Sequence, residues 1–449
     1  MACLEGLAHS LISHFLIGST GMKPRLTSFF LCLGLVCAPA WAENNQQLTL
    51  DAAIERVAQG HPELRLIEGQ RRVLDARAEI AAQRPQMTAG LELENVLGSG
   101  SYKGADQAEL SVSLAGTLER GGKLDARRVL ASANIDQLAP QREMARLDLL
   151  AETARRYLVI AGAVQQQRIA KLDITHRQRA VDAARRRHQA GGAPESVVLT
   201  AQSSLAEAEL DRDSAAQAER AARQSLSALW NSTTPAAGDV TGDPLVLPAA
   251  GEFAAFSEQL TRSPELALLQ GEARVRESEL RLARTASRAD IGWQLGARRF
   301  QDSDDTALFA GISLGLGSSA RAAPGIRAAE AELALIPLQR EALQVRLHAA
   351  AAQAFGEYQT SRLEAARLGS DVLPRLARAE KSAAAAWAAG ATSYLEWAQL
   401  QDQQAQAMRR QLQAALAAQS ALIELQRLTG QPIIDSTKSP SSAQDPTSP

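Results

Sequence analysis

Few side chains in this sequence have the types and spacing that catalysis or metal binding requires. The four histidines after residue 42 stand far apart, and none has a carboxylate at the spacing of a metal site: they are His61, His176, His188 and His348. No nucleophile motif, phosphate-binding loop or catalytic carboxylate pair stands out from the charged helical segments. The sequence therefore predicts no catalytic residue, no metal site and no cofactor.

The amino-terminal segment has the features of an export signal. From Met22, a basic start precedes an apolar run over residues 26–36, which is too short to cross a bilayer. Ala40-Trp41-Ala42 then has the A-x-A form of a cleavage site. We therefore expect residues 1–42 to be leader and signal peptide, with translation starting at Met22. All three cysteines precede this site, so the mature chain would contain neither a disulfide nor a thiolate ligand.

The composition of the 449 residues is typical of long helices. Ala, Gln, Arg, Leu and Glu are abundant, and aromatic residues make up only 4%, which is few for the core of an enzyme. The formal net charge of −2 gives no indication of a nucleic-acid partner. A mean hydropathy of −0.17 argues against a helical membrane protein.

Two glycine-containing segments each separate one long helical pattern from the next. Residues 189–198 contain two glycines followed by Pro-Glu, and residues 388–397 contain Gly390 followed by Ser393 and Glu396. Glycine suits the left-handed position after a helix. Ser393 and Glu396 have the spacing of a capping box. Because Gly192 and Gly390 lie 198 residues apart, we expect two helical hairpins with equivalent turns.

Further similarities indicate that the chain is a tandem repeat. Ser263-Pro264-Glu265-Leu266 resembles His61-Pro62-Glu63-Leu64 at an offset of 202 residues. Gln339-Arg340-Glu341 repeats Gln141-Arg142-Glu143 at an offset of 198 residues. The offset falls by 4 across the strand region, as expected if one outer loop is shorter.

Four segments alternate between apolar and polar or small residues, as half-buried strands do. Leu91 and Leu93 belong to the first, and residues 110–115 form the second. Residues 291–298 and 308–317 repeat the pattern. We expect the chain to divide as follows: leader and signal peptide, 1–42; first repeat, 43–230, with β-hairpin 86–118 and long α-hairpin 123–230; linker, 231–251; second repeat, 252–430, with β-hairpin 290–317 and long α-hairpin 324–430; and a disordered tail, 431–449.

The helical part predicts a long coiled coil. Residues 123–189 contain a single proline and a single glycine, and would span about 100 Å as one helix. Their apolar positions have the 4-3-4-3 spacing of a coiled-coil seam: Leu147, Ala151, Ala154, Leu158 and Ala161. In the second repeat, Pro374 and Gly369 are expected to break the corresponding helix. The predicted fold is mainly α with a small β part.

Four strands with this alternation cannot form a closed barrel alone. Open sheet edges are not viable in lipid, and the smallest membrane barrels have about eight strands. We therefore expect the strands to be pooled between subunits in a shared transmembrane β-barrel, unless they form small hairpins in water.

The duplicated hairpin pattern resembles the TolC-type outer-membrane efflux factors over nearly all of the mature chain. Residues 113–127, which read S-L-x-x-x-L-E-x-G-G-K-x-x-x-R, resemble the heavy-metal, CzcC-like branch of that family. The resemblance implies a homotrimer with a twelve-strand barrel in the bacterial outer membrane and a helical tunnel in the periplasm. It also implies a passive conduit, not an enzyme, that docks through a periplasmic adaptor (membrane-fusion) protein to an inner-membrane pump of the resistance-nodulation-division type. The exported substrates would be heavy-metal cations.

Two groups of residues are candidates for function. Those expected to contact the adaptor at the periplasmic turns are Gly192, Glu195, Ser196, Val197, Gly390, Ser393, Tyr394, Leu395 and Glu396. Helix capping is the alternative explanation for these residues. Those expected to line the barrel lumen are Glu92, Glu94 and Arg298, where a ring of charge can bias ion passage or simply solvate the pore. The basic residues 185–188 are expected to complement the dipole of the helix that ends there.

Two other functions agree with the same features. A channel of this fold for drug efflux or type I secretion would have the same generic polar tunnel. A soluble periplasmic coiled-coil adaptor or scaffold would also be exported and rich in long helices. Adaptors, however, have one helical hairpin, whereas two are expected here, each preceded by a β-hairpin. Osmotic shock would release a scaffold and leave a membrane channel behind.

Overall fold

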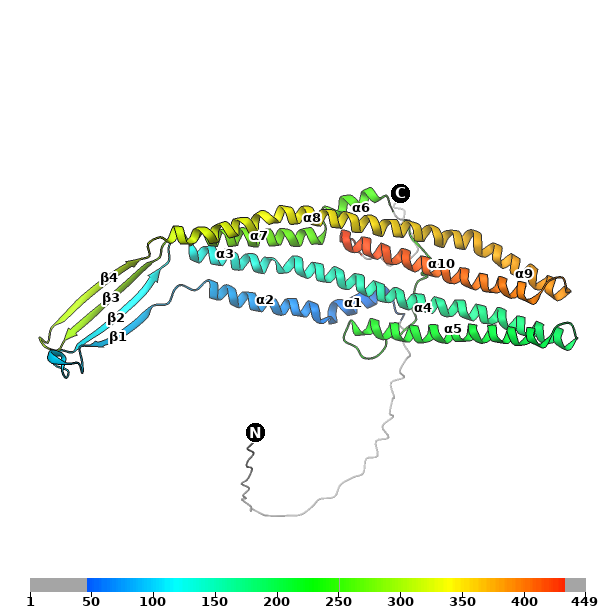
Figure 1. The fold of residues 1–449 in the computed structure, drawn as a ribbon, viewed down its shortest axis with the longest axis horizontal. Helices are drawn as coiled ribbons and strands as arrows, with labels where there is room; N and C mark the ends of the chain where they lie inside the picture. Colours follow the sequence, from blue (N-terminus) through cyan, green and yellow to red (C-terminus); the bar gives the residue numbers. More distant parts are fainter. Residues whose placement is uncertain (1–46, 250, 433–449) are drawn as a thin grey trace, which may run out of the picture. The chain divides into compact units, whose positions relative to one another are not determined.

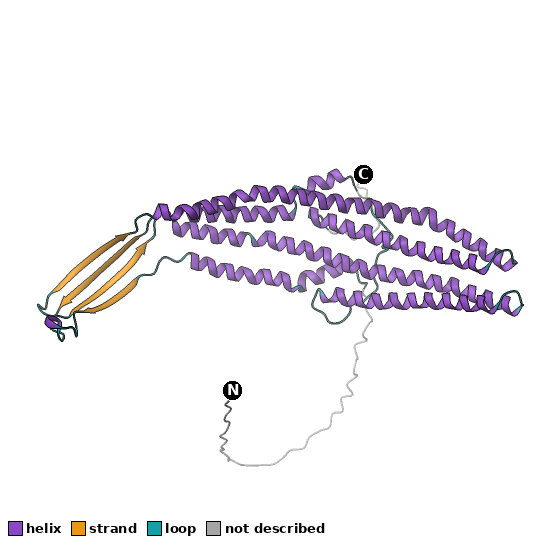
Figure 2. Cartoon of the chain, in the orientation of Figure 1, coloured by secondary structure: helices purple, strands orange, loops and turns teal. Residues whose placement is uncertain are grey.

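The computed structural model describes residues 47–249 and 251–432, all within the unit of the chain that begins at Asn45. Long helices and one sheet make up this unit (Figures 1 and 2). The expected signal peptide lies outside the described residues, as does the expected tail from residue 433 on. No helix among the described residues is both long enough and apolar enough to cross a membrane.

The first repeat begins with two capped helices. Helix α1 (Leu50–Gly60) has Thr49 as its N-cap, and the threonine hydroxyl accepts a hydrogen bond from the Ala52 amide at 3.1 Å. Helix α2 (Pro62–Ala81) is capped by His61, whose Nδ1 accepts from the Glu63 amide at 3.2 Å. The proline occupies the first turn of α2, where its missing N–H leaves no helical bond unmade.

The long helix expected over residues 123–189 is nearly continuous. Helices α3 (Lys123–Asp136) and α4 (Leu138–Gln189) meet at Gln137, whose backbone is itself helical. Helix α4 alone has 52 residues and is therefore about 80 Å long. All five expected seam residues are buried. Helix α5 (Glu195–Ala228) packs back along α4.

The second repeat has the same order of elements. Short helix α6 (Phe253–Leu260) precedes α7 (Pro264–Thr285), whose N-cap Ser263 accepts from the Leu266 amide at 3.2 Å. The long helix is α8 (Ser318–Arg367), a π-helical turn η2 (Leu368–Val372) and α9 (Leu373–Ala389). Helix α10 (Tyr394–Thr429) returns along α8 and also contacts α4.

The expected start of the second long helix, at residue 324, was wrong. The helix begins at Ser318, six residues before residue 324, and includes Pro324 and Pro337. Packing against α7 offsets the free-energy cost of these prolines within a helix. Between the two prolines, ion pairs from Arg276 to Glu332 (3.1 Å) and from Arg284 to Glu330 (3.0 Å) join α7 to α8.

The interruption expected near Gly369 and Pro374 is present, since α8 ends at Arg367 and α9 begins at Leu373, but the residues between them form a π-helical turn and not a loop. The wider π turn places Pro374 in the first turn of α9, where an amide N–H is not needed. Beside this turn, the side chain of Gln411 donates to the Ala365 carbonyl at 3.4 Å.

The four strands form one antiparallel sheet in the order β1-β2-β3-β4. They are β1 (Thr88–Glu94), β2 (Glu109–Leu118), β3 (Ile291–Phe300) and β4 (Thr306–Leu314). A short helix, η1 (Gly100–Tyr102), lies in the loop between β1 and β2. The central β2–β3 pairing joins the two repeats, with Ser113 opposite Gly296. Among the described residues, the outer edges of β1 and β4 have no partner strand.

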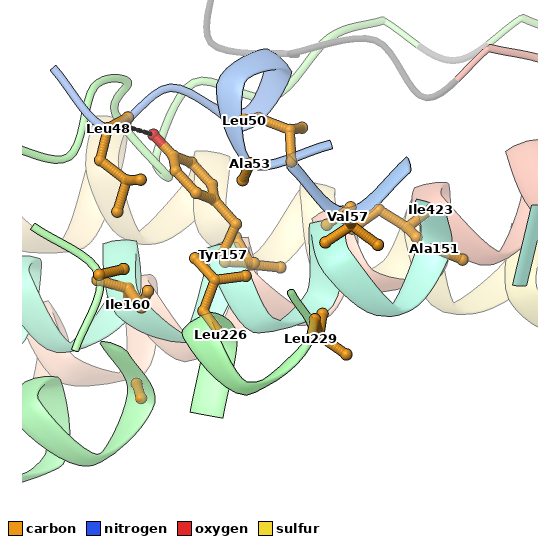
Figure 3. Packing of buried hydrophobic residues seen from close by; sticks show 14 of the residues in the cluster. Leu48, Leu50, Ala53, Val57, Ala151, Tyr157, Ile160, Leu226, Leu229 and Ile423 are labelled. Atoms are coloured by element: carbon orange, nitrogen blue, oxygen red, sulfur yellow. Dashed lines mark hydrogen bonds between the residues drawn. The ribbon is translucent and has the colours of Figure 1, made fainter. Parts of the chain in front are cut away.

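The segment expected to be a linker is packed firmly against the helices. The Tyr157 hydroxyl of α4 lies 2.7 Å from the carbonyl oxygens of both Leu48 and Thr241, and Figure 3 shows this tyrosine inside the largest apolar cluster. Arg223 of α5 donates to the carbonyls of Ala236 and Gly238, each at 2.9 Å. In the second repeat, Tyr358 of α8 donates to the Pro248 carbonyl. One tyrosine from each repeat therefore holds the connecting segment in place.

Candidate functional site

The two turns that join α4 to α5 and α9 to α10 share one backbone design. In each, a glycine with a left-handed backbone follows the helix: Gly191 at φ 73° and Gly390 at φ 85°. The next amide then donates to the carbonyl five residues back, from Gly192 to Arg187 and from Ala391 to Ala386, both at 2.8 Å. This is the Schellman arrangement, which satisfies carbonyls that a helix end leaves free.

The structure corrects the alignment of the two turns by one residue. Gly191, not Gly192, is equivalent to Gly390, so the offset is 199 residues instead of 198. The backbone of Gly192 has no positive φ, and its structural counterpart is Ala391. Two adjacent glycines fit the same sequence pattern, so the pattern alone could not show which one takes the left-handed conformation.

Most of the residues expected to contact an adaptor lie exposed at the two turns. Glu195 and Ser196 lie in the first turn of α5, and Leu395 and Glu396 lie in the first turn of α10, all exposed. Ser393 caps α10 by accepting from the Glu396 amide at 3.3 Å. The other half of the expected capping box does not form, because the Glu396 carboxylate accepts from the Thr392 hydroxyl.

An aromatic cluster lies directly beneath the turns. The rings of Trp387 and Trp397 stack with centroids 5.3 Å apart, and Tyr394 packs edge-on against both. Small side chains complete this core: Ala180, Val181, Ala184 and Ala201. Tyr394, expected among the exposed contacts, is only 7% exposed, and burial raises the pKa of its hydroxyl. Its place in the core explains its position next to a turn better than surface contact does.

A buried ion cluster links three helices farther from the turns. The guanidinium of Arg177, 6% exposed, pairs with Asp173 of α4 at 3.0 Å and with Asp402 of α10 at 2.5 Å. Arg409 of α10 pairs with Asp211 of α5 at 2.5 Å. This cluster could not be predicted from local sequence patterns, because its members lie up to 236 residues apart.

One face of the sheet carries the residues expected to line a lumen. Glu92, Ser111 and Arg298 lie opposite one another on adjacent strands and therefore share a face. Arg298 pairs with Glu94 at 3.0 Å and with Glu109 at 2.7 Å. Glu109 was missed, although its place two residues before Ser111 puts it on the same face. These four charged residues, Glu92, Glu94, Glu109 and Arg298, sum to a formal charge of −2.

The opposite face of the sheet is apolar and exposed. Leu91 of β1 is 73% exposed, and Leu308 and Ile312 of β4 are 85% and 82% exposed. Val112 and Leu295 on the central strands are also more than half exposed. No element among the described residues covers this face, so it is available to an apolar environment.

The G-G-K motif lies at the junction of sheet and helices. Arg127 forms a bidentate pair with Glu119 at 2.5 and 2.9 Å and donates to the Gln83 carbonyl at 3.1 Å. Lys123 donates to the Asp290 carboxylate at 2.7 Å. The motif therefore ties the end of β2 to the segments that lead into β1 and β3.

The described residues contain no group of three or more His, Cys, Asp or Glu side chains arranged to hold a metal ion. Two histidines have structural partners instead. His61 caps α2, and Nδ1 of His188 lies 2.9 Å from the Ala193 carbonyl oxygen.

Comparison with known proteins finds one matching family over the first repeat. Residues 53–232 match the sequence pattern of the family described as Outer membrane efflux protein. The match covers the first repeat and less than half of the chain, so the chain is similar to this family over that repeat. Proteins of this family are outer-membrane efflux channels of the TolC type, with a tunnel that extends into the periplasm, and are not enzymes. Channels of this family form trimers within tripartite efflux systems.

Individual relatives agree with this assignment. The chain is 26% identical to the cobalt-zinc-cadmium resistance protein CzcC of Cupriavidus metallidurans over 281 residues, which cover 62% of this chain and 67% of the relative. Its fold is similar to that of CusC, with a TM-score of 0.71, 16% identity and coverage of 85% and 92% of the two chains. VceC of Vibrio cholerae gives a TM-score of 0.67 at 16% identity, with 86% and 97% covered. The expected TolC-type fold is confirmed.

Proposed function

We propose that this efflux channel is a homotrimer that exports heavy-metal cations, and that it receives them through a periplasmic adaptor from a pump of the resistance-nodulation-division type. The proposal rests on the sheet, which among the described residues has two unpaired edges, an exposed apolar face and a charged polar face.

The unpaired edges support the trimer. Strand edges present rows of free N–H and C=O groups, and lipid offers them no partner. If β1 of one copy pairs with β4 of the next, three copies bring twelve strands together and remove every edge. The apolar face, with Leu91, Leu308 and Ile312, would then contact lipid, and the face with Glu92 and Arg298 would line the lumen.

The charge of the polar face supports cationic substrates. The strands contribute three glutamates and one arginine to that face in each chain, and Arg298 is shared between Glu94 and Glu109. A trimer would therefore carry a net negative lumen, which attracts cations and repels anions. The similarity to CzcC, a cobalt-zinc-cadmium resistance protein, points to the same class of substrate.

The proposal also gives roles to the two repeats and to the residues at the turns. Residues 43–230 and 252–430 act as two tandem repeats, which in three copies give six turns. The turn residues exposed beside Gly191 and Gly390 meet the adaptor, among them Glu195, Ser196, Leu395 and Glu396. Gly192, Val197 and Ser393 belong to the same surface, and Tyr394 supports it from below.

Metal resistance of intact cells tests the proposal. Cells that lack the gene are compared with cells that express the wild-type chain or the double variant Glu92→Gln, Glu94→Gln. We expect deletion to lower resistance to zinc, cobalt or cadmium, the wild type to restore it, and the double variant to restore it only in part. Ser111→Ala on the same face, which removes no charge, is the matched control. A deletion that sensitises cells to drugs but not to any of these metals would contradict the proposed substrate class.

A further inference from the structure

Arg187 binds both turns at once, and no other side chain among the described residues is seen to do so. It lies two residues before the end of α4 and is half-buried. Its Nε donates to the Gly192 carbonyl of its own turn at 3.1 Å, and its Nη1 donates to the Trp387 carbonyl at the end of α9. Its guanidinium also lies over the Trp387 ring, 5.1 Å from the centroid.

The two turns leave space for this arginine. A Cβ atom at Gly192 would lie 3.1 Å from Cγ of Arg187, and one at Gly390 would lie 3.3 Å from its Nη2. Both distances are shorter than ordinary van der Waals contact. The absence of a side chain at Gly192, where the backbone does not require glycine, therefore has a steric reason.

Arg187 brings a positive charge to the end of α9, which has no basic residue of its own in its last turn. The last turn of α4 contains three basic residues, Arg186, Arg187 and His188, whereas the last turn of α9 contains none. Free carbonyls at a helix end carry partial negative charge and favour a nearby cation. Arg187 supplies that cation to a helix whose end lies about 200 residues away in the sequence.

We propose that Arg187 is a positioning residue that holds the two turns in register, so that each chain presents them to the adaptor as one surface. This inference rests on the proposed docking at the turns. The planar guanidinium is suited to the role because it presents several donors in a fixed fork and stacks on an aromatic ring at the same time. A lysine has one ammonium group and cannot reproduce that geometry.

Two substitutions test the role of Arg187 against a matched control. Arg187→Gln removes the charge and the fork, and Arg187→Lys keeps the charge alone. Arg186→Gln makes the same charge change one residue away, at an exposed position. Because the cysteines of the chain all precede residue 42, cysteines introduced as Ser196→Cys and Leu395→Cys provide specific sites for spin labels on the two helices after the turns.

The first measurement is the distance distribution between these labels in the purified full-length protein in detergent. We expect narrow distributions for the wild type and Arg186→Gln, a clearly broader one for Arg187→Gln and an intermediate width for Arg187→Lys. The amount of oligomer should be the same in all four. An unchanged distribution in Arg187→Gln would overturn the positioning role, whatever the activity of the channel.

The second measurement is metal resistance in cells expressing the same variants without the label cysteines. We expect resistance with Arg187→Gln to fall toward that of cells lacking the gene, while Arg186→Gln retains wild-type resistance. A broad distance distribution combined with full resistance would show that docking does not need the turns in register. Failure of the proposed function itself is distinguishable, because resistance would then be unaffected by deletion of the whole gene.

Discussion

At the scale of single residues, the two turns depend on glycines whose roles differ. Gly191 and Gly390 have left-handed backbones, which L side chains other than Asn and Asp rarely adopt. Gly192 instead has an ordinary backbone and is constrained by the nearness of Arg187. The sequence pattern located both turns, but assigning the left-handed position required the hydrogen bonds of the Schellman arrangement.

We predict that the double variant Gly191→Val, Gly390→Val abolishes efflux while oligomer formation and membrane insertion continue. A β-branched residue at positive φ costs about 1–3 kcal/mol at each turn, which is enough to reshape the turn but not to unfold helices of this length. The measurement is metal resistance together with the amount of oligomer in outer-membrane fractions.

Asparagine provides the control for these positions. Gly191→Asn with Gly390→Asn should retain most of the resistance, because asparagine tolerates the left-handed conformation. Full resistance in the valine double variant would show that the shape of the turns is not needed for docking.

At the scale of elements, local sequence signals predicted much of the structure. Period-2 alternation located all four strands, and the two matching segments that begin at Ser263 and His61 lie at the starts of α7 and α2. The seam from Leu147 to Ala161 identified the buried face of α4. These signals can be predicted because they depend on residues that are close together in the sequence.

Features that depend on partners far apart in the sequence could not be predicted from local signals. Arg127 and Lys123 were visible as motif residues, but their partners Gln83 and Asp290 belong to other segments. Pro374 and Gly369 marked where the second long helix is interrupted, but not that the interruption is a π turn packed against α10. The ion cluster at Arg177 joins three helices that only the folded chain brings together.

We predict that Arg177→Met destabilises the contact between α4 and α10. The substitution leaves the buried carboxylate of Asp173 without its 3.0 Å partner, and breaking one side of a buried pair costs about 3–5 kcal/mol. The apparent Tm of the purified protein should fall clearly. Arg179→Met, exposed on the same helix, should change it little. Equal shifts for the two variants would contradict a structural role for the cluster.

At the scale of the whole molecule, several copies of the chain are needed to complete one sheet. The sheet joins the two repeats through β2 and β3, yet its outer edges and its apolar face have no partner among the described residues. Similarity to the efflux family agrees with both features, because channels of that family form trimers. Pairing of β1 with β4 of the next copy would bury the edges and set the charged faces around one lumen.

The mass of the full-length protein, purified from outer membranes in mild detergent, tests this claim most directly. Native mass spectrometry should give a complex of three times the mass of the mature chain, and heating in SDS should reduce it to single chains. A folded protein with a far-ultraviolet spectrum rich in helix and the mass of one chain would contradict the account, because the sheet edges would then have to be satisfied without a second copy.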